Sequence, residues 1–397
     1  MNARARTLLV GTLALWLTGV YASAQPDRPA ARQARLDTPA PLPGSRPFRM
    51  GFTTFPYDVS LEAVENTYGF INEHADLVLF HHDHGVPWTE ALSGLPYHPN
   101  LVAEINAEVA RIRPQQRVFV SATMQSQARA AELADYWGQD IHMPLPPQWQ
   151  GLAMDHPDVI EAYTNWCRYL IDRFDPDYFA YGIETNGGFV SPDDPGFVGF
   201  TTLVQQVYTT LKADYPDLPV LLSVQTGSTA STREDFLEIT NTLLDSTDIV
   251  GISTYPYFLR HLNGWDSYTD PRALPDDFLT AITQLAPEKP VAISETGYIA
   301  QDLDIPAYGM FIPGSSFWQM LYVRTLLLEL TALDAEFVTW FVSRDYDLMQ
   351  SYLDEHGIPY GPEFFIWRDN GLLDGNGAAR PALTEWDRWL ALPLDDD

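Results

Sequence analysis

The chain has 397 residues, 46% of them hydrophobic and 19% charged, a balance that indicates a folded globular protein and excludes global disorder. The 53 acidic residues outnumber the 23 basic ones, which gives a formal net charge of −30. A surface this negative repels phosphate backbones and anionic lipid headgroups, so nucleic acid and membrane surfaces are excluded from the expected partners. The single cysteine, Cys167, excludes an intramolecular disulfide and a cysteine zinc cluster, and its place on an apolar helical stripe predicts a buried core thiol.

The N-terminal part of the sequence is predicted to stand outside the fold. Two arginines precede an apolar run over residues 8–20, and an A-x-A cleavage site ends at Ala24, which is the pattern of a signal peptide over residues 1–24. The apolar run is too short for a membrane span. Residues 25–46 are rich in proline, alanine and arginine and predict a flexible tether. We therefore expect a secreted or periplasmic protein whose residues 47–397 form a single domain.

The remaining sequence alternates between short strand-like runs and longer helical segments. The predicted strands span residues 48–55, 75–82, 116–124, 177–185, 219–226, 248–256, 290–298 and 336–343. Between them, apolar residues recur at three- and four-residue steps, which is the spacing of an amphipathic helix. Several strands are almost continuously apolar, as in a parallel sheet that is covered on both faces. Eight such units, with a last helix at about residues 382–392, predict an α/β fold of the (β/α)8 TIM barrel type.

An open, doubly wound sheet is the alternative architecture. Such folds often carry a glycine-rich phosphate turn after the first strand, and this sequence has TTFPYD at that position. The barrel is therefore favoured. In a barrel, the loops that follow the strands gather at the face that holds the active site.

The long loops after the third, sixth, seventh and eighth predicted strands are rich in aromatic residues. They carry Trp137, Trp149, Trp265, Tyr268, Tyr308, Trp318, Tyr346, Tyr352 and Trp367. Flat rings suit neutral sugars, because the C–H face of a pyranose packs on a ring while the hydroxyl groups reach polar neighbours. The loops therefore favour a carbohydrate cleft, with internal packing of half or more of the rings as the alternative.

Two glutamates end predicted strands. Glu184 ends the fourth strand in YGIET, and Glu295 ends the seventh in AISETG. Both lie in apolar runs, where an ionised carboxylate is costly unless it is paired or functional. Strands 4 and 7 of an eight-stranded barrel lie across the mouth from one another, so that two such carboxylates can face one bond. Glycoside hydrolysis needs this pair, because one carboxyl group protonates the leaving oxygen while the other attacks or stabilises the anomeric carbon.

With these motifs the chain resembles the clan A glycoside hydrolases, (β/α)8 barrels in which the acid/base glutamate ends strand 4 and the nucleophile ends strand 7. The resemblance implies that Glu184 is the acid/base and Glu295 the nucleophile of a retaining hydrolase. The segment GISTYPYF (251–258) is similar to strand 6 of the family 53 endo-β-1,4-galactanases, in which a tyrosine contacts the nucleophile, and Tyr255 is the matching residue. Trp340 matches the tryptophan that forms a sugar platform on strand 8. Neither a cofactor nor a metal is implied for this chemistry.

The sequence departs from the clan pattern at two places. The clan has asparagine directly before the strand-4 glutamate, where it binds the sugar 2-hydroxyl, and this chain has Ile183 there. Asn186 lies two residues after Glu184, and strand alternation would turn both to the same side, so Asn186 is expected to take over the sugar contact. The family also carries an arginine on strand 2, where this chain reads LVLFHHDHG.

The histidines of the second strand have several interpretations. Alternation would place His82 and His84 on one side of the strand and His81 and Asp83 on the other. We expect His81 and His82 to line the sugar subsite beside Glu295 and to bind hydroxyl groups. The alternatives are a plain structural role and a metal-dependent barrel hydrolase, because imidazole and carboxylate ligands suit zinc, iron or manganese.

The sequence thus predicts a secreted retaining glycoside hydrolase, with endo action favoured, whose partner is a neutral β-linked poly- or oligosaccharide. The strand-6 likeness favours galactan over mannan, xylan or glucan. The alternative is a carbohydrate-binding barrel without turnover, which the missing asparagine before Glu184 keeps open. Asp345 and Asp347, after the eighth strand, are expected to be solvated loop acids, with hydroxyl or cation binding as the alternative.

Overall fold

The computed structural model describes residues 42–228, 230–257, 270–274 and 278–395. Within them, eight strands are hydrogen-bonded into a closed barrel in the order β1-β10-β7-β6-β5-β4-β3-β2. These strands are β1 (Arg49–Thr53), β2 (Leu77–His82), β3 (Arg117–Ala122), β4 (Tyr178–Gly182), β5 (Val220–Gln225), β6 (Val250–Thr254), β7 (Val291–Thr296) and β10 (Phe337–Trp340). The predicted (β/α)8 TIM barrel is confirmed, and the alternative of an open, doubly wound sheet is wrong. Each strand lies inside its predicted range and is shorter than predicted.

Helices connect the strands along the chain. The α-helices described are α2 (Leu61–His74), α3 (Trp88–Ser93), α4 (Pro99–Val109), α5 (Pro157–Phe174), α6 (Pro195–Asp214), α7 (Arg233–Leu244), α8 (Thr280–Thr283), α9 (Ser316–Ala332), α10 (Asp347–His356), α11 (Phe364–Arg368) and α12 (Pro381–Leu390). The 3₁₀ turns are η2 (Pro147–Trp149), η3 (Pro271–Ala273) and η4 (Pro306–Tyr308), and a small antiparallel hairpin joins β8 (Leu303–Ile305) to β9 (Met310–Ile312). The loop that follows β10 contains α10 and α11.

Several helices begin at residues that satisfy free backbone amides. The side chains of Ser60, Asp194, Thr232 and Ser315 accept hydrogen bonds from the first turns of α2, α6, α7 and α9. Proline stands near the start of α4, α5, α6 and α12, where its missing amide hydrogen costs nothing. The helix starts are therefore fixed largely by local sequence.

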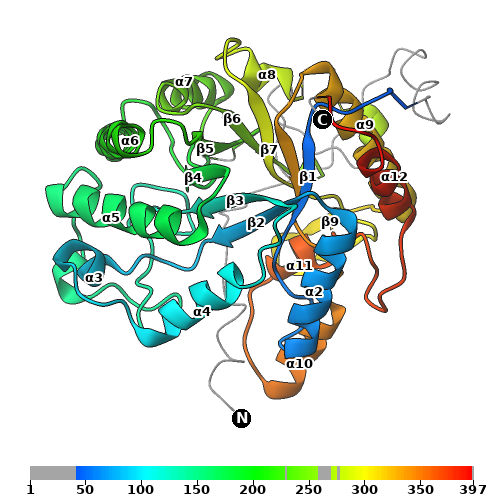
Figure 1. Ribbon diagram of the computed structural model, residues 1–397, viewed down its shortest axis with the longest axis horizontal. Coiled ribbons are helices and arrows are strands. Elements are labelled where there is room, and N and C mark those ends of the chain that lie inside the picture. Colours follow the sequence, from blue (N-terminus) through cyan, green and yellow to red (C-terminus); the bar gives the residue numbers. More distant parts are fainter. Residues whose placement is uncertain (1–41, 229, 258–269, 275–277, 396–397) are drawn as a thin grey trace. The chain divides into compact units, whose positions relative to one another are not determined.

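The barrel chain divides into two compact units. The first contains residues 78–251 and 282–289, and in it β3, β4 and β5 pair in parallel. Helices α5, α6 and α7 lie outside these strands (Figure 1). Cys167 lies on the buried face of α5, as predicted, and burial raises the pKa of its thiol.

The second unit contains the described parts of residues 42–77, 252–281 and 290–395. In it β1 pairs with β10 and β10 pairs with β7, all in parallel. Helix α12 packs against α9, and the rings of Phe52 and Trp386 lie 4.9 Å apart in this core. The two predicted catalytic glutamates, Glu184 and Glu295, belong to different units.

The described backbone joins the fold before the domain boundary expected at residue 47. Arg46 is 4% exposed, and its amide donates to the Pro393 carbonyl at 2.9 Å. Its guanidinium pairs with Asp76 at 2.6 Å. Arg46, assigned to the tether from sequence, is therefore fixed to the second unit, and its backbone pairs with Leu394 in a short parallel bridge.

Other predictions fall on residues that the structure does not describe. The predicted signal peptide and the tether up to residue 41 lie outside the described residues, as do Trp265 and Tyr268. In the part of the chain that is described, no helix combines the length and apolar character needed to cross a bilayer.

Candidate active site

Glu184 lies in a turn after β4 and not on the strand itself. β4 ends at Gly182, and its pairing with β5 shifts in register between Ala180 and Gly182. Glu184 has a left-handed φ of 52°, which is uncommon for a residue with a side chain and is found at turns and functional sites. The amide of Thr185 donates to the Ser223 carbonyl at 2.9 Å and ties the turn to β5. The backbone therefore turns at the predicted acid/base instead of continuing as a strand.

The carboxylate of Glu184 faces an ion pair. Arg129 Nε, in the loop after β3, lies 3.6 Å from Glu184 Oε2. The same guanidinium donates two hydrogen bonds to Asp83, from Nη1 to Oδ1 at 3.0 Å and from Nη2 to Oδ2 at 2.8 Å. Burial opposes the ionisation of Asp83, but the charge and hydrogen bonds of Arg129 outweigh it and lower the pKa of Asp83. The positive charge beside Glu184 is therefore already compensated.

His81 belongs to the same group of side chains. Its Nδ1 lies 2.9 Å from Ser121 Oγ in a hydrogen bond, and the ring is half-buried. Burial lowers the pKa of His81 to about 4, with the charge of Asp83 acting against this shift and that of Arg129 adding to it. His81 is thus neutral near pH 7, a state in which imidazole can both donate and accept a hydrogen bond. Its predicted contact with a sugar hydroxyl stays a prediction.

Glu295 lies within β7 near its carboxyl end and is 7% exposed. The hydroxyl of Tyr255, the residue directly after β6, donates a hydrogen bond to Glu295 Oε1. The tyrosine contact that the family resemblance implies is therefore present. Burial and the negative charge of Glu295 also raise the pKa of Tyr346, so that this neighbouring hydroxyl keeps its proton.

Partly exposed aromatic rings surround Tyr255. The ring of Phe341, directly after β10, lies 5.7 Å from Phe55, 6.2 Å from Tyr255 and 6.2 Å from Trp367, measured between centroids. Phe55, Phe341 and Trp367 are half-buried, whereas Tyr255 is 1% exposed. These three half-buried rings lie near the Tyr255–Glu295 pair, and their apolar faces are suited to packing against one face of a pyranose.

The prediction of a sugar contact for Asn186 is wrong. Asn186 is fully buried, and its Nδ2 donates to the Gln225 carbonyl at 3.1 Å and to Thr240 Oγ1 at 2.8 Å. Its Oδ1 accepts from the Gln225 amide at 2.7 Å. Alternation does not apply because the backbone turns at Glu184. Ile183, in the place of the clan asparagine, is 2% exposed and offers no replacement.

The prediction that Trp340 is a sugar platform is also wrong. Trp340 is fully buried, and its Nε1 donates to the Asn370 carbonyl at 2.8 Å. Its ring lies 6.1 Å from Tyr322 of α9 and 6.3 Å from Trp386 of α12, so the side chain is directed to the outer helices. The ring of the next residue, Phe341, lies instead beside Phe55, Tyr255 and Trp367.

His82 does not line a sugar subsite, contrary to prediction. It is 1% exposed, its ring lies 5.4 Å from Phe174 of α5, and its Nε2 lies 3.6 Å from Glu108 of α4. Burial, with the neighbouring His84 and His81, lowers the pKa of His82, so the ring is neutral. The predicted side of His84 is confirmed, since the His82 and His84 rings lie 6.2 Å apart.

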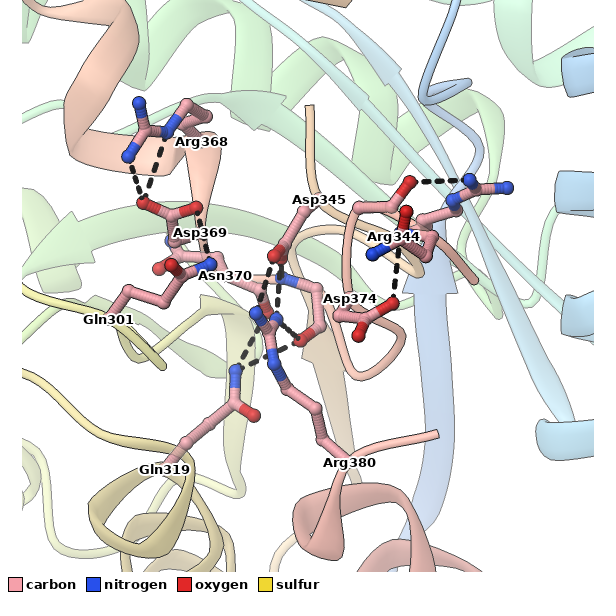
Figure 2. A network of polar contacts seen from close by, with 12 residues as sticks. Gln301, Gln319, Arg344, Asp345, Arg368, Asp369, Asn370, Asp374 and Arg380 are labelled. Carbon is pink, nitrogen blue, oxygen red and sulfur yellow. Dashed lines mark hydrogen bonds and ion pairs between the residues drawn. The ribbon is translucent and has the colours of Figure 1, made fainter. Parts of the chain in front are cut away.

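The loop after β10 is held by a network of ion pairs (Figure 2). Asp345 is fully buried and accepts from Arg380 Nη1 at 2.6 Å, and Arg380 also reaches the Gly371 carbonyl at 2.7 Å. Asp369 pairs with Arg368 at 2.7 Å. The prediction that Asp345 is a solvated loop acid is therefore wrong.

Asp345, Asp347 and Asp369 each place a carboxylate oxygen within 4.8 Å of the others, a spacing that could hold a metal ion. Two of the three are already neutralised by arginine, and Asp347 is exposed. We therefore interpret the group as part of the internal network that fixes this loop. The loop carries Tyr346 and Trp367, both close to the Glu295 region.

Of the aromatic residues predicted to line a cleft, seven lie in the described residues. Trp137, Trp149 and Tyr346 are buried, while Tyr308, Trp318, Tyr352 and Trp367 are half-buried. Internal packing therefore explains the buried rings. Trp367 is the one among the seven whose ring contacts Tyr255 within 6.5 Å.

The sequence interpretation missed Arg129 and Phe341. Arg129 is one of many loop arginines, and no spacing connects it with Asp83 or Glu184. A signal for Phe341 was available, because a β-strand that buries Trp340 on one face must present Phe341 on the other.

Comparison with known proteins agrees with this description. Residues 133–316 match the family model of glycosyl hydrolase family 53, and this range contains β4 with Glu184, β6 with Tyr255 and β7 with Glu295. The resemblance drawn from the sequence is thus confirmed for the central part of the chain. No curated protein matches the sequence.

Several solved structures share the fold. An exo-β-1,4-mannosidase from Opitutaceae bacterium strain TAV5 has a TM-score of 0.56 at 12% identity, over 86% of this chain and 59% of that one. A GH5_18 protein from Bifidobacterium longum subsp. longum has a TM-score of 0.57 at 14% identity, over 88% and 81%. A GH5_18 protein from Streptomyces cattleya, solved with GlcNAc, has a TM-score of 0.53 at 15% identity, over 87% and 80%.

At these identities the likeness concerns the fold, and this chain spans 59% of the length of the mannosidase. A shared fold does not establish a shared function, so the match of residues 133–316 to the family 53 model is the more specific finding. The chain is therefore a (β/α)8 barrel, and its residues 133–316 match the family model of glycosyl hydrolase family 53.

Proposed function

We propose that the protein is a retaining glycoside hydrolase that cleaves a neutral β-linked glycan, with Glu184 as acid/base and Glu295 as nucleophile. The observation that carries the proposal is the hydrogen bond from Tyr255 to the buried carboxylate of Glu295, because it orients a group that the local apolar surroundings would not otherwise favour. The positions of the two glutamates after β4 and on β7 support it, since loops and side chains at the carboxyl ends of barrel strands form the catalytic face.

In this proposal each glutamate acts at one side of the glycosidic bond. Glu184 gives its proton to the departing oxygen while Glu295 attacks the anomeric carbon and forms a glycosyl ester. Glu184 then removes a proton from water, which displaces Glu295 and restores the original anomeric configuration. Tyr255 holds Oε1 of Glu295 and so orients the carboxylate for attack.

The proposed substrate is a neutral polysaccharide, with β-1,4-galactan as the first candidate because of the family 53 match. The half-buried rings of Phe55, Phe341 and Trp367 would pack on the C–H face of the sugar, and His81 would contact a hydroxyl group. A mannan is the second polysaccharide to test, because one structural neighbour is an exo-β-1,4-mannosidase. We also propose endo action and export through the N-terminal signal peptide, with cleavage after Ala24.

A specific observation favours a second candidate function, a sugar-binding barrel without turnover. The clan uses an asparagine before the acid/base to bind the sugar 2-hydroxyl, and neither Ile183 nor Asn186 is available for that contact. A barrel without this contact loses transition-state stabilisation more than it loses ground-state affinity.

The test begins with product analysis on β-1,4-galactan, mannan, xylan and β-glucan. The proposal expects oligosaccharides from one of them, with loss of at least about 10³-fold in kcat/KM for Glu295→Ala and for Glu184→Ala on that polysaccharide. Azide should rescue both variants on an aryl glycoside, giving the β-azide with Glu184→Ala and the α-azide with Glu295→Ala.

The two azide products should therefore have opposite anomeric configurations, and each configuration assigns the role of the glutamate that was replaced. Hydrolysis that is retained in both variants would refute the assignment of Glu184 and Glu295 as the catalytic pair. Saturable binding with no product from the parent protein would favour the sugar-binding barrel. Export is checked separately by N-terminal sequencing of the protein from the periplasm or medium, where the proposal expects a first residue of Gln25.

A further inference from the structure

Arg129 occupies an unusual backbone position in the loop after β3. Its φ is 54°, in the left-handed region, although it is 3% exposed and carries a long side chain. Such a conformation costs of the order of 1–3 kcal/mol and persists only when the surroundings impose it. The surroundings here are polar, since the Gln125 side chain donates to the Arg129 carbonyl at 2.8 Å and the Arg129 amide donates to the Ser126 carbonyl at 2.9 Å.

The Arg129 loop also packs directly on the turn that carries Glu184. A Cβ added to Gly188 would lie 2.4 Å from the Ala128 carbonyl oxygen and 2.5 Å from that of Arg129. The two backbones therefore touch at a position that only glycine permits. The backbones of Glu184 and Arg129 both have a left-handed φ. This contact between the two loops fixes their relative position, in addition to the contacts of their side chains.

The side chain of Arg129 connects Asp83 with Glu184. Two hydrogen bonds to Asp83, of 3.0 and 2.8 Å, fix the plane of the guanidinium, and its third nitrogen then lies 3.6 Å from Glu184 Oε2. Arginine suits this geometry because its planar fork binds a carboxylate with two nitrogens and keeps Nε for another group.

We propose that Arg129, clamped by Asp83, is a positioning residue that holds the carboxyl group of Glu184 in the orientation for proton transfer. This inference rests on the proposed function, in which Glu184 is the acid/base. Asp83 has a second effect, because a guanidinium without a counter-charge would favour the ionised form of Glu184, which cannot donate a proton. The pair thus orients the acid while adding little net charge beside it.

The two members of the pair should therefore have opposite effects on the pH dependence. Removing the positive charge with Arg129→Met should move the basic limb of the kcat/KM profile to higher pH. Removing the negative charge with Asp83→Asn leaves the guanidinium uncompensated and should move the same limb to lower pH. We expect each displacement to be about one pH unit, the size usual for a charge within 4–6 Å.

Leaving-group dependence distinguishes positioning from a general loss of structure. The assay compares kcat/KM for the cleaved polysaccharide with that for the 2,4-dinitrophenyl β-glycoside of the same sugar, whose leaving group needs no protonation. Arg129→Met should lower the polysaccharide value about tenfold or more and leave the dinitrophenyl value within about twofold. Arg129→Lys should recover part of the loss, since lysine keeps the charge but not the fork.

Arg117→Met is the matched control, because it removes an ion pair with Asp177 at the start of β3, where Arg117 is exposed. It should change neither the pH profile nor the ratio between the two substrates. Two results would overturn this inference without affecting the acid/base assignment of Glu184. One is an equal loss on both substrates with Arg129→Met. The other is a displacement of the basic limb in the same direction by Arg129→Met and Asp83→Asn.

The failure of the proposed function gives a different result. Glu184→Ala should lose the polysaccharide activity, keep much of the dinitrophenyl kcat/KM and recover with azide. A Glu184→Ala variant that still degrades the polysaccharide overturns the acid/base assignment itself, and the inference falls with it. Thermal unfolding midpoints of all variants show whether a loss comes from misfolding. If Arg129→Met does not fold, Arg129→Gln replaces it, because glutamine is uncharged and keeps a polar group near the position of Nε.

Discussion

Replacing Asn186 with alanine should destabilise the barrel and leave sugar recognition almost unchanged. The structure makes Asn186 a fully buried link, with two hydrogen bonds from Nδ2 and one to Oδ1. Alanine removes all three and leaves the Gln225 amide, the Gln225 carbonyl and the Thr240 hydroxyl without these partners. None of the three can reach bulk water without local opening, because Gln225 is 5% exposed and Thr240 is fully buried.

The size of the effect follows from the unpaired groups. A buried donor or acceptor left unsatisfied costs about 1–3 kcal/mol. The Thr240 hydroxyl still donates to the Phe236 carbonyl at 2.7 Å, so its loss is the smallest of the three. We expect Asn186→Ala to lower the free energy of unfolding by about 3–4 kcal/mol. For a barrel of this size, roughly 2 °C per kcal/mol puts the fall in Tm at about 6–8 °C.

The assay is urea unfolding followed by tryptophan fluorescence, together with kcat and KM at 25 °C. Asn165→Ala provides the matched control, since Asn165 is half-buried on α5 and donates to the Ala91 carbonyl at 3.0 Å. We expect about 1 kcal/mol for the control. If Asn186→Ala unfolds within about 1 kcal/mol of the parent while its KM rises tenfold or more, then Asn186 contacts sugar and the structural argument is refuted.

Three further outcomes follow from the structure. Burial raises the pKa of Glu104 to about 7, so the folded state binds a proton that the unfolded chain releases near pH 4.5, and stability falls as the pH rises from about 4.5 to 7. In urea unfolding, the free energy of unfolding of Glu104→Gln should therefore equal that of the parent at pH 4 and exceed it by roughly 1–2 kcal/mol at pH 8, a value reduced because the side chain is partly exposed. An equal gain at both pH values would contradict this. Phe341→Ala should raise the KM for the polysaccharide several-fold and lower Tm by a few degrees, whereas Trp340→Phe should lower Tm and leave KM unchanged. The reverse pattern would show that Trp340 is the sugar platform. A formal net charge of −30 predicts that Tm rises between about 0.05 and 1 M NaCl, because the Debye length falls from over 10 Å to about 3 Å; a flat or falling Tm would show that repulsion is not a major cost.

The barrel could be predicted because its signals are local and repeated. Each strand is a short apolar run, and each helix has an apolar stripe, so eight units in succession leave few other arrangements. The strand ends were less predictable. All eight predicted strands are longer than the observed ones, since an apolar run continues into the buried first residues of the following loop, as at Ile183 after β4.

The Glu295 region followed from sequence because it is built on regular strands. Tyr255 directly follows β6 and Glu295 lies in β7, so parallel pairing of neighbouring strands brings two predicted residues together. The Glu184 region did not follow, because its geometry depends on one backbone residue. A left-handed φ at Glu184 ends the alternation that the Asn186 prediction assumed. The residue type does not predict this conformation, because glutamate adopts a left-handed φ only where tertiary contacts impose it.

The errors at Trp340 and Asn186 share a physical origin with the missed role of Arg129. Sequence similarity identifies a residue type near a position, while the direction of a side chain depends on register and backbone turn, which a change of one residue reverses. Arg129 reaches Glu184 only because a glycine, Gly188, lets the two loops touch, and that contact joins segments about 60 residues apart. The catalytic carboxylates of such a barrel are therefore predictable from strand position, and the residues that orient them are not. For this reason the opposite pH displacements expected for Arg129→Met and Asp83→Asn test the part of the site that only the structure supplies.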